Sequence, residues 1–504
     1  MSSNRLKLFS RPGFWLCAAL LLLPFMLTND SLWIDEGDTA MYALQPDFSS
    51  WWQHLRQDPA ADCQMPLSML FAWISGRMLG VGEWQMRAVN LLWGVVTLAG
   101  MYRVGRRIQL PWLPVLLAVQ PYFWFYMNEA RPYALQIACG SWLLVAFVEF
   151  LSRKAAGESW AWLLAASTFF LFLSTLLAPV SVAAIVIAGV VVAVLNHWKP
   201  NRRALLILLA GAAANIPTAI YHLSTLVRGV KSAMLWHVDL KFFGYVLYEL
   251  TGLTGLGLST EEIRHLAKSP HFFATFSAHG WQFALPALGF VLVAGVIIFG
   301  LRRQSSGLPP GLRAGLVSVL GLTALTFVAG GLVLQKAFWA RHFAPMFPFY
   351  VVLLGVALAG LTSRRHRVVR WLPFLVVGLL IFSALNLRFS PVWRKEDYRS
   401  AAQFARQALT ENKSVWWVGA DYCANYYGLE CAESRPETGK VFCPQFGGAE
   451  TLPPPDVIVF SKPDIYDAKF VVQEIIKRDH YQEAARFKSF TVWTNSGTPR
   501  LISP

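Results

Sequence analysis

Long apolar segments separated by short polar connectors run along most of this chain of 504 residues. A membrane core about 30 Å thick needs about 20 apolar residues of helix, and most of these segments approach that length. The pattern predicts an all-α polytopic membrane protein with about eleven spans. Their expected bounds are roughly 13–29, 86–103, 111–127, 133–151, 160–177, 179–196, 204–221, 282–301, 314–334, 344–362 and 371–387.

One apolar segment, from Met65 to Leu79, does not fit the series of spans. It holds only about fifteen residues and is interrupted by Ser68, Ser75 and Arg77. Such a length suits a helix that lies in the membrane interface or re-enters from one side. We therefore predict an interfacial or re-entrant helix here.

Basic residues gather in every second connector, beginning before the first span. They include Arg5, Lys7 and Arg11; Arg103, Arg106 and Arg107; Arg153 and Lys154; Lys199, Arg202 and Arg203; Arg302, Arg303 and Arg313; and Arg364, Arg365, Arg367 and Arg370. Connectors rich in Lys and Arg stay in the cytoplasm. This predicts a bacterial-type inner-membrane protein with a cytoplasmic N-terminus and, after eleven spans, a periplasmic C-terminus.

The amino-acid composition agrees with a membrane location and argues against nucleic acid as a binding partner. Hydrophobic residues make up 55% of the chain and charged residues 14%, whereas a soluble protein has about a quarter charged residues. The net charge of +15 comes from the cytoplasmic clusters, so nucleic acid is not an expected partner. No cysteine spacing suggests zinc, and an oxidising compartment permits a bridge between Cys423 and Cys431.

The same pattern predicts two domains. Residues 1–388 form a transmembrane domain with extracytoplasmic loops at 30–85 and 222–281, and residues 389–504 form a small periplasmic α/β domain. The latter has no nucleophile elbow and no Gly-rich turn, so we expect an accessory role. Its expected helices are Tyr398–Leu409 and Ala468–Arg478, and its expected strands are Ser414–Val418, Asp456–Phe460 and Ser489–Thr494.

A cluster of carboxylates follows the first span directly. It contains Asp35, Glu36 and Asp38, with Tyr42 one turn further on. Ionised carboxylates beside hydrocarbon are costly, so a cluster indicates catalysis or metal binding. The alternative is a hydrated helix cap, which would explain one such acid more readily than three.

Three further polar groups are expected on the same outer face. The second-loop group runs from Asn128 to Tyr133, and cations follow the seventh and ninth spans. The residues singled out are Glu129, Arg131, Tyr133, Arg228, Lys231, Lys336, Arg341 and His342.

Acids and cations at one leaflet fit glycosyl transfer from a lipid phosphate. One carboxylate can take the proton of an acceptor hydroxyl as its oxygen attacks the anomeric carbon. A phosphate leaving group needs fixed positive charge and no acid, unlike the alkoxide that a glycosidase expels. Three of these cations also have an alternative, structural role. Arg131 could form a salt bridge to Glu129 or to the first-loop acids. Lys336 and Arg341 could extend from the span ends to the membrane surface, where their charges meet water.

These residues also carry a resemblance. The chain resembles the GT-C class of polyprenyl-phosphate-dependent glycosyltransferases, in particular the glycosyltransferase family 39 type, which includes protein O-mannosyltransferases and lipid A aminoarabinose transferases. The similarity covers about the first 200 residues. The matching segments are Asp35-Glu36, Met65-Pro66-Leu67, Glu83-Trp84-Gln85-Met86-Arg87 and Glu129-Ala130-Arg131-Pro132-Tyr133-Ala134-Leu135.

The resemblance implies a catalytic role for Asp35, with Glu36 and Glu129 supporting it or a metal. It leaves the need for a divalent cation, Mg²⁺ or Mn²⁺, open. Two departures are visible: Gln64-Met65-Pro66 replaces the family's His-Pro-Pro, and nothing acidic follows Glu129 before Glu149.

We therefore expect an inverting glycosyltransferase that uses a polyprenyl (undecaprenyl) phosphate sugar on the periplasmic side. Its other partners would be membrane lipids and a lipid, glycan or protein acceptor. One alternative is a lipid or glycan transporter or flippase, which would need ionisable residues deep within its spans. Another is a non-catalytic lipid-binding subunit, which would tolerate the loss of Asp35.

Overall fold

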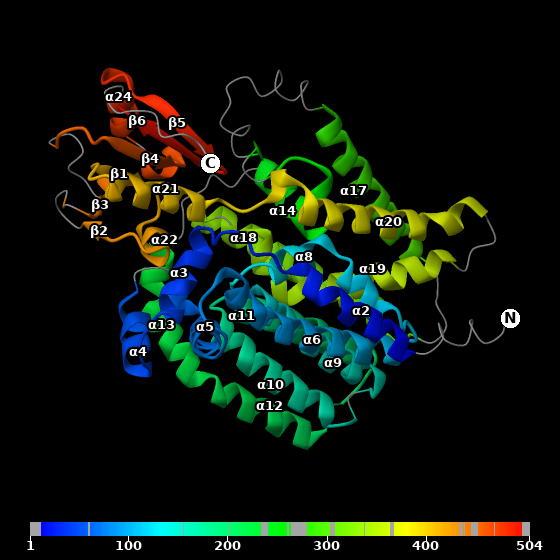
Figure 1. Ribbon diagram of the computed structural model, residues 1–504. Coiled ribbons are helices and arrows are strands. Elements are labelled where there is room, and N and C mark those ends of the chain that lie inside the picture. Colours follow the sequence, from blue (N-terminus) through cyan, green and yellow to red (C-terminus); the bar gives the residue numbers. More distant parts are fainter. Residues whose placement is uncertain are drawn as a thin grey trace. The chain divides into compact units, whose positions relative to one another are not determined.

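The structure is a computed structural model that is rich in helices and has one small sheet (Figure 1). The residues that it describes are 12–58, 61–154, 156–199, 201–232, 240–259, 262–263, 280–302, 308–336, 338–362, 367–432, 437, 439–444, 452–467 and 469–495.

Among the described residues, eight helices are long and apolar enough to cross a membrane, and two shorter apolar helices accompany them. They match ten of the eleven expected segments, so the prediction of an all-α polytopic membrane protein is confirmed. The long helices are α6 (Glu83–Arg107), α9 (Tyr133–Ser152), α11 (Ala178–Leu195), α12 and α13 (Arg202–Ala214 and Ile216–Ser232) as one span, α17 (Gly280–Leu301), α18 (Leu312–Leu334), η3 and α19 (Ala340–Met346 and Phe347–Thr362) as one span, and α20 (Arg367–Phe389); the shorter ones are α2 (Pro12–Met26) and α10 (Ser159–Ser174).

The expected span 111–127 is wrong as a single helix. It consists of α7 (Leu113–Ala118) and α8 (Pro121–Met127), which are separated by an extended residue, Gln120, with φ −75° and ψ 125°. Proline has no backbone N–H to continue a helix, and its ring disfavours the helical conformation of the residue before it. Pro121 therefore ends one helix and begins the next.

Burial separates the centre of the helical bundle from its surface. The most apolar stretch of α9 is 94% buried and that of Ala340–Thr362 is 89% buried, whereas the other six spans are 17–44% buried. These two elements meet closely, because a Cβ at Gly140 would overlap the carbonyl oxygen of Pro345. The other spans expose large apolar side chains, such as Leu223 and Val333, as expected of helices that face lipid.

Short helices lie outside the long apolar ones. The Met65–Leu79 segment forms α5 (Pro66–Leu79), a single helix of 14 residues, and its interfacial or re-entrant position stays a prediction. The others are α3 (Ile34–Ala43), α4 (Phe48–Gln57), η1 (Ala61–Gln64), α14 (Leu240–Leu250), η2 (Thr254–Leu256) and η4 (Pro391–Trp393).

The C-terminal residues form a six-stranded sheet in the order β2-β3-β1-β4-β6-β5. The first four strands of that order are parallel, and the last two pair antiparallel. Side chains alternate along β1, so Trp417 packs in the same core as α21 while Trp416 packs in the same core as α24. The elements are α21 (Tyr398–Thr410), β1 (Val415–Val418), α22 (Asp421–Tyr426), β2 (Cys431–Ala432), β3 (Val441–Phe442), β4 (Val457–Ser461), α23 (Pro463–Tyr466), α24 (Val471–Arg478), β5 (Gln482–Phe487) and β6 (Phe490–Thr494).

The five elements predicted for the C-terminal region are all present, and the domain is α/β as expected. The structure adds α22, α23, β2, β3 and β5. The cysteines, all six of them in the described part of the chain, are free. The structure therefore contains no bridge between Cys423 and Cys431.

Contacts divide the chain into two compact units, which we describe separately. The membrane unit comprises Met1–Thr28, Ser49–Phe71 and Arg87–Trp393, and the C-terminal unit comprises Asn29–Phe48, Ala72–Met86 and Arg394–Pro504. Parts of segment 30–85 thus belong to the same unit as the sheet. The sequence instead predicts this segment in the transmembrane domain and a domain boundary after residue 388.

Candidate active site

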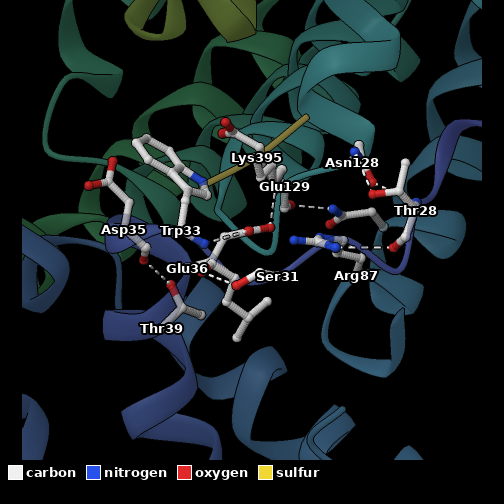
Figure 2. A network of polar contacts seen from close by, with 12 residues as sticks. Thr28, Ser31, Trp33, Asp35, Glu36, Thr39, Arg87, Asn128, Glu129 and Lys395 are labelled. Atoms are coloured by element: carbon white, nitrogen blue, oxygen red, sulfur yellow. Dashed lines mark hydrogen bonds and ion pairs between the residues drawn. The ribbon is translucent and has the colours of Figure 1, made fainter. Parts of the chain in front are cut away.

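The carboxylate cluster lies at the start of α3 in the C-terminal unit. Asp35 and Glu36 occupy the first turn of this helix, where the partial positive charge of a helix N-terminus stabilises anions. Consecutive helical residues point about 100° apart, and Figure 2 shows the two side chains diverging from the helix start. Asp35 is half-buried and Glu36 is fully buried, so only Asp35 has surface to offer a substrate.

Glu36 is held by a lysine from a distant part of the sequence. The Nζ of Lys395 lies 2.7 Å from Oε1 of Glu36, and the two side chains are 12% and 0% exposed. The backbone N–H of Trp33 donates to Oε2 of Glu36 at 3.4 Å. The buried carboxylate is thus paired with a cation, as a buried charge requires.

The chain before α3 is fixed by α21 and α22 of the same unit. The hydroxyl of Tyr427 lies 2.9 Å from Oγ of Ser31 and accepts from the N–H of Leu32 at 2.8 Å. Arg399 donates to the carbonyl of Asn29 at 2.7 Å and forms an ion pair of 2.7 Å with Glu83. Glu83, from the first turn of α6, also accepts from Tyr427 at 3.2 Å.

Helix α3 packs directly against α22. A Cβ at Gly37 would overlap the Sγ of Cys423, so a larger residue there would force the buried thiol to shift. Burial raises the pKa of Tyr422 well above its usual value, and the nearby thiol of Cys423 and the carboxylates of Asp38 and Asp35 add to the rise. Tyr42, the fourth first-loop candidate, is fully buried.

The second-loop group lies in the turn between α8 and α9 of the membrane unit. Asn90 of α6 donates to the carbonyls of Met127 at 3.1 Å and Glu129 at 2.5 Å. Asn128 exchanges two hydrogen bonds with Thr28, whose carbonyl also accepts from the fully buried Arg87 at 3.1 Å (Figure 2). The turn is therefore fixed by buried side chains on both sides.

Arg131 is engaged by a first-loop acid. Its two terminal nitrogens donate to the two carboxylate oxygens of Asp62 in η1, at 2.5 and 2.8 Å. Both side chains are almost fully buried, at 7% and 3% exposure. The salt bridge weighed as the alternative role of Arg131 is thus present, with Asp62 as the partner.

A tyrosine-rich hollow lies close to several candidates in the membrane unit. Tyr133 packs edge-on against Tyr126, with ring centroids 4.9 Å apart, and the buried Glu129 acts electrostatically on Tyr126. Glu249 of α14 is close enough to Arg341 for the charge of the arginine to lower its pKa. The hollow is lined by Tyr122, Phe125, Tyr126, Glu249, Thr254 and Trp393.

Glu249 was not singled out by the sequence. Burial raises its pKa from 4.5 to about 7, although a hydrogen bond from Tyr245 at 2.9 Å and the charge of Arg341 both lower it. It is therefore a carboxyl group that exchanges a proton near neutral pH. Carboxyl groups of this kind, in a concave site with other polar groups, are typical of functional sites.

Replacing Glu249 with Gln should remove a pH-dependent destabilisation. Because the folded-state pKa exceeds the unfolded one, this group's contribution to stability is complete below pH about 4.5 and is lost as the pH rises through 7, by at most about 3 kcal/mol. The melting temperature of Glu249→Gln in detergent, relative to that of the wild type, should therefore rise between pH 5 and pH 8. Glu430→Gln, at a position with a 79% exposed side chain, is the control and should show no gain. A pH-independent difference for Glu249→Gln would contradict the assignment.

The remaining candidates differ in their surroundings. Lys336 is half-buried beyond the end of α18. The ring of His342 lies 5.8 Å from that of Phe338 and 6.5 Å from that of Phe327, in an aromatic setting. The backbones of Arg228 and Lys231 belong to α13, but their side chains lie outside the described residues.

The residues proposed for a divalent cation do not fit one in this structure. Glu36 already binds an ammonium group at 2.7 Å, which a cation would have to displace. No cluster of three or more His, Cys, Asp or Glu side chains suited to a metal occurs among the described residues. We therefore derive no chemical step through a metal.

The candidates thus fall into two groups, one in each unit. Asp35, Glu36, Asp38 and Tyr42 share α3, and Glu129, Tyr133 and Arg341 lie around the tyrosine-rich hollow. Sequence reasoning missed Lys395, Asp62 and Glu249. Lys395 alone left a signal, since it stands in the charged run Arg394-Lys395-Glu396-Asp397 directly after the last span.

No family model matches the chain, and no curated protein matches it. Its fold is shared by solved structures, among them two of ArnT. ArnT from Cupriavidus metallidurans in the apo state superposes with a TM-score of 0.52 at 14% identity, covering 96% of this chain and 97% of that one. ArnT from the same organism bound to undecaprenyl phosphate gives a TM-score of 0.51 at 14% identity, covering 96% and 98%. The expected GT-C fold is confirmed.

Proposed function

We propose that the protein is an integral membrane glycosyltransferase that moves a sugar from a polyprenyl phosphate, undecaprenyl phosphate in the first instance, to an acceptor on the periplasmic side. The observation that carries the proposal is the pair of acids at the start of α3. Glu36 is buried and neutralised by Lys395, while Asp35 beside it keeps exposed surface. A structure of the same fold contains undecaprenyl phosphate, which supports the choice of donor.

The reaction is a single displacement at the anomeric carbon. The carboxylate of Asp35 takes the proton of an acceptor hydroxyl. The electron pair freed on that oxygen forms a bond to the anomeric carbon. The bond from that carbon to the phosphate oxygen breaks on the opposite face, and its electron pair leaves with the phosphate. The configuration is inverted, and the products are the glycosylated acceptor and polyprenyl phosphate.

The phosphate gains negative charge as it leaves, and fixed cations stabilise that charge. We assign this role to Lys336 and Arg341, with Arg228 and Lys231 as further candidates. Arg131 ranks below them, because both of its terminal nitrogens already bind Asp62. We assign donor binding to the surroundings of Glu129, Tyr133 and Arg341, since the tyrosine-rich hollow beside them has room for only about one water molecule.

Reconstituted protein tests the reaction. Proteoliposomes would be supplied with undecaprenyl phosphate linked to a hexose, a pentose or an amino sugar, together with lipid, glycan and peptide acceptors. We expect release of free undecaprenyl phosphate, detected by mass spectrometry, with one donor and one acceptor class. Movement of the intact lipid-linked sugar between leaflets, without cleavage, would instead support a flippase.

A further inference from the structure

Glu36 is a fully buried carboxylate one residue from the proposed base. It forms an ion pair with Lys395, which comes from a segment 359 positions later in the chain. Breaking a buried ion pair by removing one partner leaves an uncompensated charge, which is strongly destabilising or forces the group to take up a proton. The start of α3 therefore depends on Lys395.

The same C-terminal segment limits how α3 can move. The hydroxyl of Tyr427 forms hydrogen bonds with Ser31 and Leu32 just before the helix. The Sγ of Cys423 packs against Gly37, one turn into the helix. With Lys395 on Glu36, the helix is held at three successive points. These contacts restrict both sliding and rotation of the helix, and thus the direction in which Asp35 points.

We propose that Lys395 is a positioning residue of the transfer reaction. It acts through Glu36 to set the orientation of Asp35, and α22 completes the support. This inference rests on the proposed function, since it assigns the C-terminal unit a part in catalysis in place of an accessory role. A displacement of about 1 Å at a reacting group can lower the rate by about 10²-fold, so loss of the ion pair should appear in kcat.

The first experiment is a set of variants in the reconstituted transfer assay. Lys395→Met should lower kcat by about 10- to 100-fold with a donor KM within about twofold of the wild type. Lys395→Arg keeps the charge and should retain most of the activity. Glu36→Gln combined with Lys395→Met removes both charges and should recover activity relative to Lys395→Met alone, because no unpaired charge stays buried.

Lys440→Met is the matched control. Lys440 belongs to the same unit and pairs with Glu437 at 2.8 Å, but the two side chains are 36% and 53% exposed, against 12% and 0% for Lys395 and Glu36. Surface ion pairs contribute little, so this variant should keep the wild-type kcat. Melting temperatures of all variants, measured in detergent, separate loss of folded protein from loss of turnover.

A second experiment tests the contact between α3 and α22. Gly37→Ala places a methyl group against the Sγ of Cys423 and should lower kcat, whereas Gly37→Ala with Cys423→Ala makes room for it and should restore kcat. Failure of the second substitution to restore activity would count against positioning by α22.

The results distinguish failure of the positioning role from failure of the proposed glycosyltransferase function. A wild-type protein that releases no undecaprenyl phosphate, or an Asp35→Asn variant that releases it normally, defeats the proposed function. A wild-type protein that is active, with Lys395→Met equally active or impaired only in donor KM, defeats the positioning role alone.

Discussion

Replacing Asp35 with Asn should lower sugar transfer by about 10²- to 10⁴-fold, the usual contribution of a general base. Asparagine has nearly the same shape as aspartate but cannot take a proton from the hydroxyl group of the acceptor substrate. Asp35 is half-buried and not part of the Glu36–Lys395 ion pair, so the variant should fold and insert normally. Release of undecaprenyl phosphate measures the rate, and size-exclusion profiles in detergent measure folding.

Asp47→Asn is the control for that result. Asp47 is an exposed carboxylate of the same loop, a few residues beyond the end of α3, and its loss should not change transfer. Full activity in Asp35→Asn would leave the non-catalytic lipid-binding subunit as the better interpretation of the α3 cluster.

Replacing Arg131 with Ala should destabilise the protein by about 3–5 kcal/mol, the usual cost of removing one partner from a buried ion pair. The substitution leaves the Asp62 carboxylate, 3% exposed, without its two donors. Asp62→Ala should have a similar effect, because it removes the carboxylate that both terminal nitrogens of the buried guanidinium group bind. Melting temperature in detergent and yield of inserted protein report the loss.

The double variant Arg131→Met with Asp62→Leu separates two roles for this arginine. If Arg131 serves to join η1 to the α8–α9 turn, the apolar pair should recover much of the stability and keep transfer active. A stable double variant with a strongly raised donor KM would show that Arg131 binds the phosphate, as the sequence first indicated.

Much of the fold could be predicted because its signals are local. A run of about 20 apolar residues identifies a span without knowledge of its neighbours, and β1 and β4 appear as short apolar runs between turn residues. The strands that were missed carry no such signal, since β2 and β3 have two residues each and β5 is polar. The break before Pro121 was missed because average hydropathy takes no account of a single proline.

The site was predictable only in part, for a related reason. The acids at 35–38 stand out because they follow an apolar segment directly, and the sequence alone shows that contrast. The partner that neutralises Glu36 lies in another part of the chain, and nothing local pairs Lys395 with it. Glu249 was hidden for a different reason: it lies in a short apolar helix, and its burial depends on Tyr122 and Tyr126, more than 100 residues earlier.

The assembly of the C-terminal unit from three stretches of chain affects how the protein can be dissected. Ile34 packs into the same apolar core as Cys423 and Ala424, so a secreted fragment beginning at Arg394 would expose that core to water. Such a fragment should be poorly soluble on its own. Joining residues 29–48 and 72–86 to it through linkers should restore a soluble domain suited to crystallisation.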